Sequence, residues 1–333
     1  MIGRYPILRI DVAEYRPLVA RRFHACCILI ASACGIHCCC PGTLDFFSSL
    51  WSRADKPCNP NCRGILFRMA TFRSGDAQLA YEITGTGFDV VLLHPFPLNR
   101  QFWDGVLDQL SSRYRVVLPD LRAHGDSEVG DGPVTMQKLA DDLDRLCREL
   151  EITRAIFVGV SIGGYALFEF WWRCREHFAA LVLANTRAGA ETPEGRAGRL
   201  QTAEKVLREG TAGFTEDLLL KLFSKVTLAN RPDIVDEART MAKKMSPIDI
   251  GEVQRGMAER RDSIPTLATI NVPTLVIAGE DDSVPLSELE LMHQRIAGSQ
   301  YRVIAKAGHY AAMEQPAEFG RLLRTFFEGV PRG

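Results

Sequence analysis

Cysteine is almost absent from most of this 333-residue chain. Eight of the ten cysteines precede Met69, and only Cys147 and Cys174 follow it. Two isolated thiols exclude a disulfide framework in residues 69–333 and favour a reducing compartment. A cytoplasmic protein is therefore expected.

Charge of one sign and long apolar runs are also scarce after residue 68. Residues 69–333 hold 31 Lys and Arg against 37 Asp and Glu, a net charge of −6. This mild acidity argues against nucleic acid as a partner. No stretch of this part approaches the roughly twenty apolar residues that span a bilayer, so no membrane partner is expected. A small molecule is the expected partner, and the sequence leaves a homo-oligomer open.

Residues 1–68 differ from the rest, with nine Lys and Arg against four Asp and Glu. One interpretation is a signal segment, built on an arginine pair and the apolar stretch 25–36, which would export the protein. A second is a metal site that uses the C-x3-C pair at 58–62 with His37. The favoured interpretation makes Met69 the natural start and the preceding residues a spurious extension, because a strand-like pattern opens directly at Met69.

From residue 69 onward, short apolar runs alternate with amphipathic segments of helical period. Apolar runs separated by helices are typical of parallel strands, which are covered on both faces. The fold class predicted is α/β, with a mostly parallel central sheet and helices on both of its faces. Strands are expected at 79–84, 90–94, 114–119, 155–160, 180–184, 272–278 and 301–304, and helices at 102–110, 136–150, 286–296 and 316–327.

The interval 187–262 breaks this alternation. Its sequence is charged and helix-forming, with no convincing strand, and it is far longer than one crossover. We therefore expect a helical cap, inserted before the last strands and lying over the active site as a lid. The core would then consist of residues 69–186 and 263–333.

A G-x-S-x-G motif, Gly159 to Gly163, stands between the apolar run 155–160 and a helical stretch from Tyr165. A strand that turns directly into a helix leaves little space at the corner, and the two glycines relieve that contact. Ser161 is then held in a strained conformation with its hydroxyl projecting. Its place at a helix N-terminus also favours a developing oxyanion. This predicts a nucleophile.

A serine nucleophile needs a base and an acid that orients the base. His309 follows the last expected strand and is the predicted base; the other histidines lie on helices or in less suitable loops. Two aspartates, Asp281 and Asp282, follow the strand 272–278. The chain order Ser, Asp, His is that of a nucleophile elbow enzyme. This chemistry requires no metal and no organic cofactor.

Five segments together resemble the α/β-hydrolase superfamily, specifically its small esterases, enol-lactone hydrolases and cofactor-free perhydrolases. The resemblance covers about residues 76–327. The matching segments are HPFP at 94–97, DLRAHGDS at 120–127, GVSIGG at 159–164, GEDDSVP at 279–285 and AGH at 307–309.

The resemblance implies that the backbone amides of Phe96 and Ile162 form an oxyanion hole. This chain has Pro95 where the family has glycine, which leaves the Phe96 amide in place. The acid loop is one residue shorter than the family pattern. Counting from its start selects Asp282, which we prefer, and counting back from its end selects Asp281.

Leu98, Trp103 and Met257, together with Phe96, are expected to line an apolar acyl pocket. The prediction is a carboxylic ester hydrolase that cleaves a small ester or lactone. The alternatives are a cofactor-free perhydrolase of the haloperoxidase type and a non-catalytic small-molecule receptor on the same fold.

Overall fold

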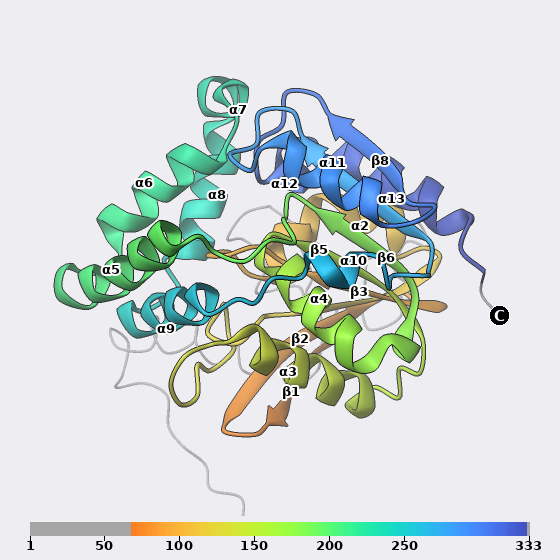
Figure 1. Cartoon of the computed structure of the whole chain (residues 1–333), viewed down its shortest axis with the longest axis horizontal. Coiled ribbons are helices and arrows are strands. Elements are labelled where there is room, and N and C mark those ends of the chain that lie inside the picture. The colour runs from red at the N-terminus through yellow and green to blue at the C-terminus, as the bar shows by residue number, and fades with distance from the viewer. Residues whose placement is uncertain (1–67, 332–333) are drawn as a thin grey trace, which may run out of the picture. The chain divides into compact units, whose positions relative to one another are not determined.

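The computed structural model describes residues 68–331, so the interpretations of residues 1–67 lie outside the described part. One eight-stranded sheet forms the centre, in the order β1-β2-β4-β3-β5-β6-β7-β8 (Figure 1). The strands are β1 (Arg68–Ser74), β2 (Ala77–Thr84), β3 (Phe88–Leu93), β4 (Tyr114–Pro119), β5 (Ala155–Val160), β6 (Phe178–Ala184), β7 (Thr274–Gly279) and β8 (Gln300–Ile304).

Strands β3 to β8 run parallel to one another, and only the pairings of β1 with β2 and of β2 with β4 are antiparallel. The predicted mostly parallel sheet is confirmed. The bounds of five strands differ from the predicted ones by one or two residues; β3, for example, ends at Leu93, and His94 belongs to the following loop. The side chain of His94 is hydrogen-bonded to the carbonyl oxygen of Pro95, in the same loop.

Helices cover both faces of the sheet, as predicted. One face carries α3 (Met136–Glu149), α4 (Ile162–Cys174) and α11 (Leu286–Arg295); the other carries α2 (Asp104–Leu110) and α13 (Pro316–Glu328). The expected helix 102–110 is in fact a 3-10 turn, η1 (Arg100–Trp103), followed by α2. Two further short helices are η2 (Arg175–His177) and α12 (Ala311–Glu314).

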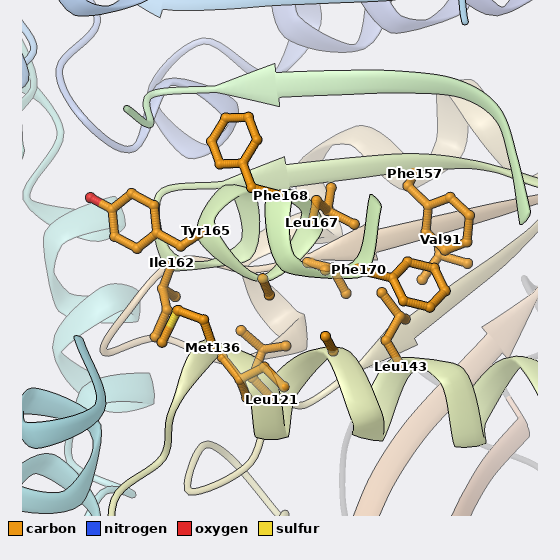
Figure 2. Packing of buried hydrophobic residues seen from close by; sticks show 14 of the residues in the cluster. Val91, Leu121, Met136, Leu143, Phe157, Ile162, Tyr165, Leu167, Phe168 and Phe170 are labelled. Carbon is orange, nitrogen blue, oxygen red and sulfur yellow. The ribbon is translucent and has the colours of Figure 1, made fainter. Parts of the chain in front are cut away.

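The two cores follow from the alternation of side chains along each strand. Val91 and Phe157 belong to the cluster under α3 and α4, whereas Val90 and Ile156 belong to the cluster under α2 and α13. Figure 2 shows the first cluster, in which the side chains of α4 meet those of α3 and of the sheet. Apolar burial on both faces therefore holds the sheet.

Six helices lie between β6 and β7, and the first five are called here the cap helices: α5 (Pro193–Glu209), α6 (Ala212–Leu222), α7 (Lys225–Asn230), α8 (Pro232–Ala242) and α9 (Pro247–Ala258). They gather on one side in Figure 1, and the short α10 (Ile264–Leu267) leads back to β7. Side chains of Thr192, Ser224 and Ser246 cap the first amides of α5, α7 and α9. No strand interrupts residues 187–262, as expected.

None of the helices within residues 68–331 has the length and apolarity needed to cross a bilayer.

Candidate active site

Ser161 stands at the corner between β5 and α4 in a strained conformation. Its φ of 54° and ψ of −116° lie where a residue with a side chain is rarely found. Three hydrogen bonds fix this backbone: its N–H donates to Ala184 O at 3.1 Å, and its carbonyl accepts from Tyr165 N–H at 3.1 Å and Thr186 Oγ1 at 2.8 Å. The surrounding structure thus balances a strain of about 1–3 kcal/mol.

The glycines of the motif are needed for close packing. A Cβ added to Gly163 would lie 2.6 Å from the carbonyl oxygen of Leu93, and one added to Gly159 would lie 2.6 Å from the carbonyl carbon of Gly163. Both approaches are shorter than real Cβ contacts. The packing of the elbow against β3 therefore excludes a larger residue at 163, and the closeness of β5 to the first turn of α4 excludes one at 159.

The amides of Ile162 and Phe96 are the candidate oxyanion donors. Ile162 is the first residue of α4, whose initial N–H groups have no partner within the helix. Among the described residues, no hydrogen-bond acceptor contacts either amide. The Phe96 carbonyl accepts a hydrogen bond from the Tyr310 hydroxyl at 3.2 Å, which ties this loop to the residue after His309.

His94 braces the loop that carries Phe96. Its Nδ1–H donates to Pro95 O at 3.0 Å, and its Nε2 accepts from Leu121 N–H at 2.9 Å. This pair of bonds requires the neutral ring. Burial lowers the pKa of His94 to about 4 and that of His124, whose ring packs edge-on at 5.0 Å, to about 3. His94 therefore has a structural role in this loop, and His124 has one beside it.

His309 and Asp282 form a buried pair. His309 Nδ1 lies 2.8 Å from Asp282 Oδ1, and the two side chains are 6% and 0% exposed. Asp282 also accepts from Val284 N–H at 2.9 Å and from Asn185 Nδ2 at 2.8 Å. Burial alone would raise the pKa of Asp282, but these partners, with His309 foremost, hold it below its usual value. Asp281 is exposed and does not contact His309.

Asn185 connects the serine to this pair. It directly follows Ala184, the residue that binds the Ser161 amide, and its Nδ2 contacts both Asp282 and, at 3.3 Å, Gly308 O. The carboxyl ends of β5, β6, β7 and β8 therefore meet at one sheet edge, where parallel sheets hold their sites. The sequence did not predict Asn185 as a site residue; its place directly after an expected strand was the available signal.

Glu314 is a second residue that sequence analysis missed. Its buried carboxylate accepts from Gly308 N–H at 2.8 Å, Ser224 N–H at 2.9 Å and Thr227 Oγ1 at 2.7 Å. The His309 amide also donates to Leu222 O, in the cap, at 2.7 Å. The loop that carries His309 is thus held by the cap helices as well as by the sheet. No local motif marks this role.

The predicted pocket residues are not brought together. Leu98 and Trp103 are fully buried in the cluster under α2 and α13, where the Trp103 ring packs 6.0 Å from Phe319. Met257 belongs to the opposite cluster, with Phe96 and Ile162. One pocket lined by all three is therefore not formed, because Trp103 lies in the turn before α2, which packs onto the sheet.

No group of three His, Cys, Asp or Glu side chains within residues 68–331 is placed to hold a metal ion.

Comparison with known proteins agrees with this architecture. Over 265 residues the chain is 28% identical to 3-oxoadipate enol-lactonase 1 of Acinetobacter baylyi, covering 79% of this chain and 97% of that one. The structure of a thermophilic esterase from Thermogutta terrifontis with malate bound has a TM-score of 0.76 at 36% identity, covering 78% and 98%. The enol-lactonase of Burkholderia xenovorans gives 0.73 at 25% identity, covering 78% and 100%.

The family model described as the alpha/beta hydrolase family matches residues 90–322, which is most of the described part. Esterases and enol-lactonases are thus among the relatives of this chain. The chain belongs to the alpha/beta hydrolase family.

Proposed function

We propose that this protein is a serine hydrolase that cleaves a small carboxylic ester or lactone through an acyl-enzyme on Ser161. The observation that carries the proposal is the buried His309–Asp282 pair, hydrogen-bonded through Asn185 to the strand end beside the strained serine. Its similarity to an enol-lactonase and to an esterase supports the same bond type.

In the first half of the reaction, the Ser161 hydroxyl attacks the carbonyl carbon and its proton passes to Nε2 of His309. Asp282 holds the Nδ1–H side of the ring and stabilises the imidazolium that forms. The amides of Phe96 and Ile162 donate to the oxyanion of the tetrahedral intermediate. When the intermediate collapses, the bond to the leaving oxygen breaks, and that oxygen takes the proton from His309.

In the second half, a water molecule replaces the leaving group. His309 accepts a proton from the water as its oxygen attacks the acyl carbon, and the same oxyanion donors act again. Collapse breaks the bond to Ser161, which recovers its proton from His309 and releases the carboxylic acid. For a lactone, the acid and the alcohol remain in one product.

The test is the Ser161→Ala variant, assayed on a panel of short-chain nitrophenyl esters and lactones. The expected loss of kcat/KM is roughly 10⁴-fold or more, and the native enzyme mixed with ester should show a Ser161-bound acyl group by mass spectrometry. Ser287→Ala, at an exposed serine of α11, is the matched control.

The absence of Ser161-dependent turnover for every ester and lactone in the panel would contradict the proposal and favour a receptor. Peroxide-dependent peracid formation that exceeds hydrolysis would favour the perhydrolase instead.

A further inference from the structure

Three arginines converge on one carboxylate between the cap helices and α4. Glu191 Oε1 lies 2.5 Å from Arg187 Nη2, 3.1 Å from Arg199 Nη2 and 3.2 Å from Arg260 Nη2. We call these three arginines the arginine cluster. They come from the loop after β6, from α5 and from the segment after α9, and none of them is a proposed catalytic residue.

The cluster carries more positive than negative charge. Within residues 68–331, Glu191 is the one carboxylate paired with any of the three arginines, so two positive charges remain uncompensated. The side chains of Arg260 and Glu191 are only 4% and 5% exposed. Arg187 and Arg199 retain 30% and 21% exposure. An uncompensated charge at such depth is costly.

The cluster also holds unused hydrogen-bond donors. Among the described residues, fourteen buried side-chain polar atoms have no partner, and four of them belong to the cluster: Nε of each arginine and Nη1 of Arg260. All four are donors. Buried donors are normally paired, so this concentration of free N–H groups calls for an acceptor.

The cluster is linked to the proposed nucleophile through Tyr165. The Arg260 guanidinium stacks 3.9 Å from the ring centre of Tyr165, whose amide bonds to Ser161 O one helical turn away. A turn of four residues advances about 6 Å along the axis. In Figure 2 the Tyr165 ring lies at the start of α4, with its hydroxyl pointing away from Phe168 and Phe170. Arg199 Nη1 contacts Met257 Sδ at 3.5 Å.

We propose that the arginine cluster binds a second, anionic group of the substrate, and that this group is a carboxylate. A guanidinium fork matches a carboxylate in bidentate geometry, and the pairing is strong when it is buried. Binding would neutralise one of the two uncompensated charges and supply acceptors for the free donors. The preferred substrate is then a half-ester of a small dicarboxylic acid or a lactone that carries a carboxylate. This inference rests on the proposed hydrolase function.

Binding is measured first, without catalysis, on the Ser161→Ala protein. We expect glutarate to raise its melting temperature, and valerate, which has the same number of carbons but one carboxylate, to raise it less. Adding Arg260→Met or Arg187→Met should abolish the difference. Adding Arg261→Met should retain it, because Arg261 contacts Glu169 and Trp172 outside the cluster. Equal shifts by both acids, or a glutarate shift that persists without Arg260 and Arg187, would overturn the proposal.

Catalysis is measured next, with monomethyl glutarate and methyl valerate. The ratio of their kcat/KM values should favour the half-ester by about tenfold in the native enzyme, as expected for a charge-assisted bond. It should fall towards one in Arg260→Met and Arg187→Met. An unchanged ratio would overturn the anion site while leaving the hydrolase proposal intact. Failure of the hydrolase proposal shows separately, as Ser161-independent turnover of methyl valerate.

Discussion

The sheet and the cap helices are stabilised by different forces. All six residues of β5 are buried, whereas α5, with seventeen residues, buries only Ala203 and Val206. Among the described residues, five of the eight large apolar side chains that are exposed lie on the cap helices, which are Leu200, Leu207, Leu220, Val226 and Ile248. Apolar burial dominates in the sheet, and the cap is joined to the loop after β8 partly through polar contacts such as those of Glu314.

Because of this difference, we expect substitutions in the two regions to affect different properties. Loss of a core side chain should unfold the protein, whereas loss of a polar contact between the cap and the His309 loop should chiefly misplace the base. The predictions below test that separation, beginning with the site that both regions help to hold.

Replacing Asp282 with asparagine should give the largest change. The variant keeps the shape of the side chain but removes the charge that stabilises the His309 imidazolium, so kcat should fall by roughly 10⁴-fold. Asp281→Asn, at the exposed neighbour, should change kcat by less than about twofold. Ester hydrolysis under saturating substrate measures both, and equal losses would contradict the assignment of Asp282.

Truncating a side chain should cost far more free energy of unfolding in the core than on the cap. Phe157 is fully buried, with its ring 4.6 Å from that of Phe178, and Phe157→Ala should lower the free energy of unfolding by about 3–5 kcal/mol. Ile248, on α9, is 57% exposed, and Ile248→Ala should cost less than about 0.5 kcal/mol. Urea denaturation measures both values, and similar losses would remove the distinction.

Acid should weaken the core because of His94 and His124. Both are fully buried, with pKa values of about 4 and about 3 in the folded chain against 6.5 for an unperturbed histidine. Below pH 6.5 the unfolded chain binds protons that the folded chain does not, so the free energy of unfolding falls as the pH falls. By pH 4.5 the loss should be roughly 2.5 kcal/mol per histidine.

Urea denaturation between pH 7 and pH 4.5 measures this dependence. His124→Gln should flatten the slope by removing one of the two groups. A slope that is unchanged in this variant would show that His124 is protonated in the folded state.

Glu314→Gln should give the smallest of these effects. One of the two acceptor oxygens of Glu314 becomes an amide group that donates. Either Gly308 N–H or the donors of Ser224 and Thr227 then lose their partner, and the His309 loop loosens. We expect kcat to fall by about tenfold, with a smaller change in KM. Thr227→Val, which removes only one donor to Glu314, should lose less. A fall in melting temperature with kcat unchanged would show a purely structural role.

Much of the sheet was predictable because its signals are local. The run Ala155–Val160 is apolar and rich in β-branched residues, and the structure contains that strand with the predicted bounds. The prediction that 102–110 is one helix was less accurate, because Asn99 caps a 3-10 turn at Arg100 before α2 begins. Such a boundary depends on a single cap, which periodicity does not reveal.

The site was predictable only in part. The motif around Ser161 and the place of His309 after a strand are visible in the sequence, but the spacing left two aspartates open. The roles of Asn185 and Glu314 depend on partners 97 and 90 residues away. No periodicity or motif carries that information.

Alternating apolar runs and helical periods thus determined the layered sheet. The glycine pair with its serine determined the sharp turn. Both features depend on residues that are close together in the chain. Tertiary structure alone decided that Asp282 faces His309, that Glu314 joins the cap to the base loop and that three arginines share Glu191. Each depends on burial next to distant segments, since a charge or a donor acquires its role only when folding removes water from it.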